Sequence, residues 1–285
     1  MSLRGRALLP AALVAALALA LLPGCAHPPT GPHRRADGRT SGQPRPRPAG
    51  RAGPEAAAAA APPYRRWGLS APLTPPPRHT RRRPAGSAGP GLPPVVDHVP
   101  TRDRVVFLTY DDGVERDPRL LDMVRELHLP VTLFLTDSVL GPGYGQLARL
   151  RAVGAGIQNH TLDHSALGGL PYAGQRAEIC GQQHKLRARF GVRPRLLRPP
   201  YGAHDPMTRR AAADCGVAAV VLWRATPGEG AGPAFTRGPH RLRPGDIVAV
   251  DPDGTGGADL RARTVRLLEA AQREGLSVGR LEDYL

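Results

Sequence analysis

Residues 26–95 lack a periodic pattern of apolar residues and contain only two acidic residues, Asp37 and Glu55. The same segment holds 17 of the chain's 33 prolines and 12 arginines, which give it a charge of +10. A segment of this composition cannot bury enough apolar surface to offset the entropy lost on ordering. We therefore predict a disordered, proline-rich tether over residues 26–95.

Aromatic residues are also scarce, at 4% of the chain, and most of the net charge of +15 lies in the tether. Residues 96–285 carry only +3. Nucleic-acid-binding proteins place basic residues on a folded face with aromatic side chains between them, so this distribution argues against a nucleic-acid partner. A basic tether suits anionic lipid headgroups or anionic wall polymers. The alternative is an arginine-rich spacer without a partner.

The N-terminal stretch has the pattern of an export signal. Arg4 and Arg6 precede an apolar run that only Pro10 interrupts, and Leu-Pro-Gly-Cys25 closes it. This order favours a secretory signal over a spanning helix, and small residues before a cysteine resemble a bacterial lipoprotein cleavage box. We predict a signal peptide over residues 1–25, lipidation of Cys25 and attachment to the outer face of the cell membrane. The alternatives are an ordinary signal cut nearby and an uncleaved anchor.

Residues 96–285 alternate between short apolar runs and amphipathic segments. An Asp-Pro pair at 117–118 and another at 205–206 have the form of a helix cap followed by a first-turn proline. The predicted strands are 105–108, 131–135, 156–158, 217–222 and 247–250, and the predicted helices are 118–129, 146–153, 172–190, 207–215 and 260–274. Repeated strand–helix units of this length indicate an α/β fold with a parallel sheet.

Chemistry-bearing residues follow three of the apolar runs. Asp111 and Asp112 end the run Val-Val-Phe-Leu-Thr-Tyr, and the glycine after them permits a turn. His160 and His164 follow the third predicted strand, four residues apart, which puts both imidazoles on one face of a helical turn and within reach of one ion. Each pattern alone has a plain alternative: turn chemistry for the aspartates, and surface or packing roles for the histidines.

The third stretch is Arg-Pro-Pro-Tyr-Gly at 198–202, which follows the short apolar run Leu-Leu. It places a guanidinium and an aromatic ring on a rigid segment, and its plain alternative is a proline-rich turn with a surface arginine. Because the carboxyl ends of parallel strands meet at one edge of a sheet or barrel, the three stretches are expected to lie together.

In combination and in this order, the three stretches resemble the motifs of the polysaccharide deacetylases of carbohydrate esterase family 4, the NodB homology domain. Thr-Tyr-Asp-Asp-Gly is similar to that family's first motif, His-Thr-Leu-Asp-His to its second and Arg-Pro-Pro-Tyr to its third. The resemblance covers residues 96–285. It implies a distorted, incomplete (β/α) barrel of about seven parallel strands.

Amide hydrolysis needs an activated water, a stabilised oxyanion and a proton for the leaving nitrogen. A divalent ion, for which zinc is expected, meets the first two needs if Asp112, His160 and His164 hold it. Asp111 cannot easily bind from the same face as Asp112 and is better suited to act as the base.

The resemblance implies the same division of roles. It adds that Arg198 orients the base and that the backbone N–H of Tyr201 helps to hold the oxyanion. We also expect the sugar to contact Pro200, Tyr201 and Trp223, with core packing as the alternative for Trp223.

Two positions depart from the family pattern. Glu229 and Gly230 stand where the fourth motif has an Asp-Trp pair, and Asp251 stands where the fifth motif has a histidine that acts as the acid. An aspartate is a poor proton donor at neutral pH unless its pKa is raised, so catalysis is weakened, lost or rerouted. His204 is an alternative donor, although a solvated loop histidine is the favoured interpretation.

Two cysteines remain once Cys25 is assigned to lipidation. Cys180 and Cys215 lie on neighbouring predicted helices, and both a disulfide and two separately buried thiols fit the spacing.

The sequence thus predicts an exported, metal-dependent hydrolase that removes acetyl groups from an N-acetylated polysaccharide, with peptidoglycan or a chitin-like glycan as the substrate. The alternative is a catalytically impaired lipoprotein that binds wall glycan and retains the metal site.

Overall fold

The computed structural model describes residues 61–78, 91–228, 232–251 and 259–285. The predicted signal peptide with Cys25, most of the predicted tether, and the pair Glu229 and Gly230 lie outside these residues. Within the described parts, every helix is too short or too polar to cross a lipid bilayer.

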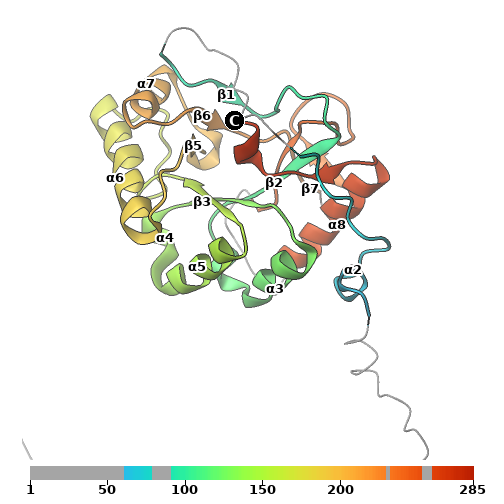
Figure 1. Ribbon diagram of the computed structural model, residues 1–285. Helices are drawn as coiled ribbons and strands as arrows, with labels where there is room; N and C mark the ends of the chain where they lie inside the picture. Colours follow the sequence, from blue (N-terminus) through green and yellow to red (C-terminus); the bar gives the residue numbers. More distant parts are fainter. Residues whose placement is uncertain (1–60, 79–90, 229–231, 252–258) are drawn as a thin grey trace, which may run out of the picture. The chain divides into compact units, whose positions relative to one another are not determined.

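One curled sheet organises the described chain (Figure 1). Its strand order is β1-β6-β5-β4-β3-β2-β9-β7-β8, and β10 pairs separately with β2. Neighbouring strands are parallel except β7 and β8, so the eight strands from β1 to β7 in this order form a continuous parallel path. The strands are β1 (Val95–Val96), β2 (Val105–Tyr110), β3 (Thr132–Leu135), β4 (Gly156–Asn159), β5 (Leu196–Leu197), β6 (Ala219–Val221), β7 (Ala225–Pro227), β8 (Pro233–Phe235), β9 (Ile247–Ala249) and β10 (Ser277–Val278).

This topology confirms the predicted incomplete (β/α) barrel. Helices cover the outside of the curled sheet (Figure 1). They are α2 (Pro63–Arg66), α3 (Pro118–Leu127), α4 (Asp137–Leu140), α5 (Tyr144–Ala152), α6 (Tyr172–Phe190), α7 (Pro206–Asp214) and α8 (Asp259–Arg273), with short 3-10 turns η1 (Val114–Arg116), η2 (Gly141–Gly143), η3 (Pro200–Gly202) and η4 (Leu281–Asp283).

Both predicted helix caps are present. The Asp117 carboxylate accepts a hydrogen bond from the backbone of Arg119 at the start of α3. Asp205 and Thr208 form a reciprocal capping box at the start of α7.

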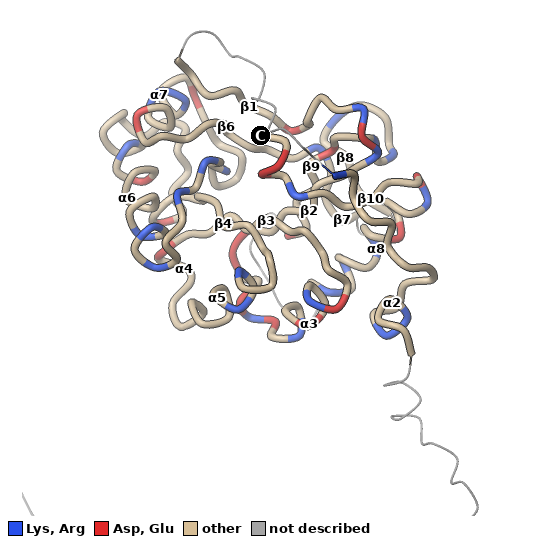
Figure 2. Tube along the Cα trace, viewed as in Figure 1, with Lys and Arg blue, Asp and Glu red and all other residues tan. Residues whose placement is uncertain are grey.

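The strands are apolar because the sheet is covered on both faces. All six residues of β2 are buried, and alternate residues belong to different clusters. Val106 and Leu108 pack beneath the outer helices, whereas Val105 and Phe107 face the barrel interior, where the ring of Tyr284 packs edge-on against Phe107. None of the ten described strands contains a charged residue, and Figure 2 shows the charges on helices and connecting segments.

Residues 61–78 pack against the folded domain, whereas the sequence predicted a disordered tether there. Leu69 is only 2% exposed and belongs to the main core cluster. The Trp67 indole N–H donates to Glu126 on α3 at 2.8 Å, and Gln272 on α8 donates to the carbonyls of Ala71 and Pro72. The prediction is therefore wrong for this segment, because a mostly extended strap buries apolar residues at irregular spacing that a periodicity search does not detect.

The structure also decides between the alternatives for the last two cysteines. Cys180 on α6 and Cys215 just after α7 form a disulfide. The bond joins two helices that pack against each other on the outside of the barrel.

Candidate metal and catalytic site

The three sequence motifs meet at one end of the barrel. Asp111 and Asp112 follow β2, His160 follows β4, and Arg198 follows β5. Because these strands are parallel and close in the order β5-β4-β3-β2, their carboxyl ends lie along the same edge. Gly113 makes the turn after the aspartates with a φ of 99°.

Asp112, His160 and His164 form a cluster that is able to hold a metal ion. Their ligand atoms all lie within 4.8 Å of one another. Among the described residues, Asp112 Oδ2 and His160 Nε2 are buried without a hydrogen-bond partner. Two imidazoles and one carboxylate match a catalytic zinc site, which keeps a fourth position open. The residues present therefore fit a divalent ion.

Backbone contacts orient two of these side chains. The amide of Thr136, just after β3, donates to Asp112 Oδ1 at 2.9 Å. His160 Nδ1 lies 2.7 Å from the carbonyl oxygen of Arg198. Because a carbonyl only accepts, Nδ1 carries the proton and Nε2 presents its lone pair to the cluster.

The electrostatics of the cluster favour a cation. Burial raises the pKa of Asp112 from 3.8 to about 8 and outweighs the hydrogen bonds from Thr136, which lower the pKa; the negative charges of Asp111 and Glu115 raise it by smaller amounts. Burial lowers the pKa of His160 to about 4, so the imidazole is neutral at physiological pH. A neutral imidazole and a carboxyl that lacks a compensating positive charge are both stabilised by a bound cation.

The two histidines do not lie on a helical turn, and that part of the prediction is wrong. Residues 160–164 form a loop in which Thr161 and His164 have φ values of 74° and 58°. The side chain of Asn159 accepts a hydrogen bond from the Thr161 amide and starts this turn directly at the end of β4. The loop brings the imidazole centroids to 5.0 Å, so the four-residue spacing is retained for a different structural reason.

Asp111 and Arg198 form a buried ion pair beside the cluster. Arg198 Nη1 donates to Asp111 Oδ1 at 2.7 Å, and Nη2 donates to the hydroxyl of Thr109 at 2.8 Å. The guanidinium carbon lies 4.2 Å from the ring centroid of Phe134 and 5.4 Å from that of Trp223. Asp111 Oδ2 is buried and has no hydrogen-bond partner among the described residues, so one oxygen remains able to accept a proton.

The three residues predicted to contact substrate have different surroundings. Tyr201 is 67% exposed, and its ring packs edge-on against His164 at 5.1 Å. Trp223 is half-buried beside Arg198, and Pro200 is buried. Tyr201 therefore offers much the largest free surface of the three.

Comparison with known proteins places this site in a family. A family model for polysaccharide deacetylase matches residues 98–220. An uncharacterized protein of Streptomyces coelicolor is 67% identical over 194 residues, which cover 68% of this chain and 78% of that protein. A chitooligosaccharide deacetylase of Bradyrhizobium sp. is 29% identical over 193 residues, which cover 61% of this chain and 88% of the relative.

This chain belongs to the polysaccharide deacetylases of carbohydrate esterase family 4. The fold agrees with that assignment. The crystal structure of a CE4 family pseudoenzyme from Bacillus anthracis superposes with a TM-score of 0.55 at 18% identity, covering 66% of this chain and 67% of that one.

The two residues considered as the proton donor, Asp251 and His204, have different surroundings in this polysaccharide deacetylase. Asp251 follows β9, is 2% exposed, and accepts a hydrogen bond from Arg263 on α8 at 2.8 Å. His204 is half-buried, and its Nδ1 donates to the carbonyl of Gly202 at 2.9 Å. The fourth-motif positions 229 and 230 lie outside the described residues.

Sequence reasoning overlooked three polar side chains of this site. Thr109 anchors Arg198, Thr136 contacts both Asp112 and the carbonyl of His160, and Glu178 holds the histidine loop. Thr136 could have been found from the sequence in the same way as Asp111 and His160, because it directly follows a strand of the parallel sheet.

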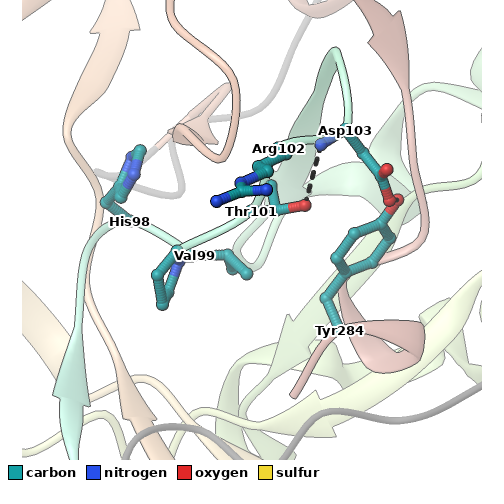
Figure 3. Close-up of a pocket in the computed structure, with 7 residues that line it drawn as sticks. His98, Val99, Thr101, Arg102, Asp103 and Tyr284 are labelled. Atoms are coloured by element: carbon teal, nitrogen blue, oxygen red, sulfur yellow. Dashed lines mark hydrogen bonds between the residues drawn. The ribbon is translucent and has the colours of Figure 1, made fainter.

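A hollow of about 710 Å³ lies at the other end of the barrel, among residues 98–103 and Tyr284 (Figure 3). Residues 98–103 precede β2, whereas Asp111 follows it. Asp103 is occupied by contacts within the protein, since its carboxylate accepts from the Tyr284 hydroxyl at 2.9 Å and its amide donates to Thr101. The hollow contains none of the site residues, and we assign it no role in the chemistry.

Proposed function

We propose that this polysaccharide deacetylase is metal-dependent and hydrolyses the acetamido groups of an N-acetylated glycan, with peptidoglycan as the first candidate and a chitin-like glycan as the second. One observation carries the proposal. The cluster of Asp112, His160 and His164 buries unpartnered ligand atoms directly beside the Asp111–Arg198 ion pair.

The metal cluster, Asp111 and Arg198 have separate roles in the proposed hydrolysis. A divalent ion in the cluster, for which we propose zinc, would supply Lewis acidity and lower the pKa of a water molecule. Asp111 Oδ2 accepts the proton from the attacking water, because Oδ1 is already engaged by Arg198. Arg198 fixes the carboxylate through a buried guanidinium that cannot turn away, held by Thr109 and Phe134.

Substrate contacts come from the exposed rim. Tyr201 presents its ring to a sugar face, and its backbone N–H helps to hold the oxyanion. The Trp223 ring packs against the guanidinium of Arg198, and Pro200 begins the 3-10 turn η3. Both residues therefore act on the substrate mainly through neighbouring groups.

Protonation of the leaving nitrogen is the step for which the site offers the poorest donor. Asp251 is engaged by Arg263, which makes the carboxyl group a poor substitute for an acid histidine. This ion pair supports a second candidate function, a glycan-binding protein that keeps the metal cluster but turns over slowly or not at all.

We further propose that the protein is exported and lipid-anchored through Cys25 on the outer face of the cell membrane. The basis is the charged, apolar and cysteine-ended N-terminal sequence. That location makes peptidoglycan the nearest N-acetylated polymer, and the basic tether suits anionic wall polymers or lipid headgroups.

Acetate release tests the proposal. The full-length chain, loaded with one zinc equivalent, is incubated with purified peptidoglycan and with a chitin oligosaccharide, and the Asp111→Asn variant serves as the control. Release that vanishes in the control supports the deacetylase. Absence of release from both glycans at stoichiometric zinc, together with retained glycan binding, supports the second candidate.

A further inference from the structure

The loop that carries the two histidines is held in a costly backbone conformation. Thr161 and His164 both have positive φ, a region that residues with a β-carbon seldom occupy and that a β-branched residue such as threonine occupies least readily. Such conformations persist only where surrounding contacts hold them. The loop therefore needs an external anchor.

Glu178 supplies that anchor from α6. Its Oε2 accepts hydrogen bonds from the amides of Leu162 at 3.1 Å and Asp163 at 2.9 Å. These two residues are the ones between Thr161 and His164. A carboxylate that accepts two backbone N–H groups makes charge-assisted hydrogen bonds, which are stronger than those of a neutral acceptor.

Helix α6 is a rigid base for this contact. It packs against β4, and Figure 1 shows α6 on the outside of the barrel. The carbonyl of Ile179 accepts from the Asn159 side chain at 2.9 Å, and Gln182 donates to the carbonyl of Leu135. The neighbouring Cys180 is tied to Cys215 by the disulfide. Residues 178–182 thus connect the helix to the ends of two strands that carry the site.

We propose that Glu178 is a positioning residue that holds His160 and His164 in the geometry needed to share one metal ion. The proposal rests on the metal site of the proposed function. Glu178 does not itself reach the ligand cluster: it acts through the backbone of the loop between the two histidines.

Zinc affinity measures this role directly. The full-length chain and its variants are stripped of metal, and the zinc dissociation constant is measured by competition with a chromophoric chelator. Glu178→Ala removes both hydrogen bonds, and the loss of a residue that orients metal ligands weakens affinity about 10- to 100-fold. Glu178→Gln keeps a carbonyl oxygen at the same distance, so its affinity should lie between those of Glu178→Ala and the unaltered protein.

Glu126 provides the matched control. It is also a helix glutamate whose carboxylate accepts two hydrogen bonds from a separate segment, here from Arg66 and Trp67. Glu126→Ala should leave the zinc dissociation constant unchanged. Thermal unfolding of each metal-free variant confirms that the protein is folded before titration.

Steady-state kinetics at saturating zinc gives a second measurement. If Glu178 positions the metal ligands, Glu178→Ala lowers kcat for acetate release while KM changes much less, and Glu178→Gln partly restores kcat. A general loss of structure would reduce the active fraction without rescue by the conservative variant.

The outcomes are distinct. Equal zinc affinity in Glu178→Ala and the unaltered protein overturns the proposal, as does an equal loss in Glu126→Ala. Failure of the unaltered protein to bind zinc overturns both this proposal and the metal site on which it rests. Normal zinc binding, weakened only in the Glu178 variants and accompanied by no acetate release from any glycan, upholds the role of Glu178 and refutes the proposed catalytic activity.

Discussion

Among the described residues, two arginine–aspartate pairs are fully buried, and they differ in how many of their polar atoms have hydrogen-bond partners. In the Arg224–Asp246 pair all five N–H donors of the guanidinium are used, by both carboxylate oxygens and by three carbonyls of the segment 237–241. Asp246 accepts two further hydrogen bonds, from His98 and from the amide of Arg243.

The Arg198–Asp111 pair is equally buried but incomplete. Arg198 Nε and Asp111 Oδ2 both lack a hydrogen-bond partner among the described residues. Buried polar atoms are normally satisfied, so unsatisfied atoms beside a metal-ligand cluster indicate a site that is built for a substrate or reagent. The comparison indicates that Arg224–Asp246 stabilises the fold, and it supports the proposal that Arg198–Asp111 takes part in the chemistry.

The largest effect should come from removing the incomplete pair's carboxylate. Asp111→Asn keeps an oxygen for Arg198 but cannot accept a proton, so we expect acetate release to fall about 10²- to 10⁴-fold, the usual contribution of a general base. Zinc content and far-ultraviolet circular dichroism should be retained. A variant that keeps more than half of the activity would remove Asp111 from the chemistry.

Disruption of the complete pair, Arg224–Asp246, should lower the stability of the protein. Asp246→Ala leaves Arg224 buried without its counter-charge, and we expect a loss of about 3–5 kcal/mol in the free energy of unfolding. Urea denaturation measures it. Asp97→Ala is the control, because it breaks the Asp97 pair with the exposed Arg237 and should cost about 1 kcal/mol or less. Equal losses in the two variants would erase the distinction between the complete pair and a surface pair.

A third arginine–aspartate pair joins Arg263 to Asp251, the residue that we predicted to occupy the position of the family's acid histidine. Asp251→His introduces a side chain that titrates near neutral pH, so we expect acetate release to rise about tenfold or more. A rise from almost no activity supports the second candidate function. Unchanged or lower activity would show that another group already donates the proton.

The smallest expected effect is on the pH dependence of the metal-free protein. Burial raises the pKa of both Asp112 and Asp246, but in Asp246 the hydrogen bonds from His98, Arg224 and the Arg243 amide outweigh burial and lower the pKa overall. In Asp112 the hydrogen bonds from Thr136 do not offset burial, and the pKa rises to about 8. Its contribution to stability is present at low pH and is lost as the pH rises through about 8.

The pKa shift of His160 changes stability with pH in the opposite direction. With a folded pKa of about 4 and an ordinary value of 6.5, its contribution is present above pH 6.5 and is lost as the pH falls toward 4. The contributions of Asp112 and His160 to stability oppose each other below pH 6.5. Between pH 6.5 and 8, only the contribution of Asp112 is expected to change with pH. There the metal-free protein should lose at most about 1.4 kcal/mol per pH unit, the limit for one proton.

Thermal or urea unfolding of the metal-free chain across this window checks the prediction. Asp112→Asn should flatten the profile because it removes the titrating carboxyl group, and saturating zinc should flatten it because the bound cation displaces the proton from Asp112. A profile that keeps its slope in Asp112→Asn would assign the titration to another group.

The success and the failure of sequence reasoning at this site have separate causes. Asp111, Asp112, His160 and Arg198 were predictable because they follow short segments that the sequence marks as strands or apolar runs, and parallel strands bring such positions to one edge. The supposed helical turn at the histidines was wrong because a four-residue spacing is also met by a loop with two left-handed residues. Spacing constrains which side chains meet without specifying the backbone between them.

The sequence by itself determined the strand–helix alternation, the parallel sheet and the residues of the candidate metal site, because these depend on local periodicity and on order along the chain. Only the tertiary structure decided the docking of residues 61–78, the Cys180–Cys215 bond, the pairing of Asp251 with Arg263 and the anchor at Glu178. The Asp251–Arg263 and Glu178 contacts span 12 to 16 residues, and the others join segments more distant in sequence. Whether such side chains meet depends on how helices and loops pack around the barrel, and no local pattern in the sequence records that packing.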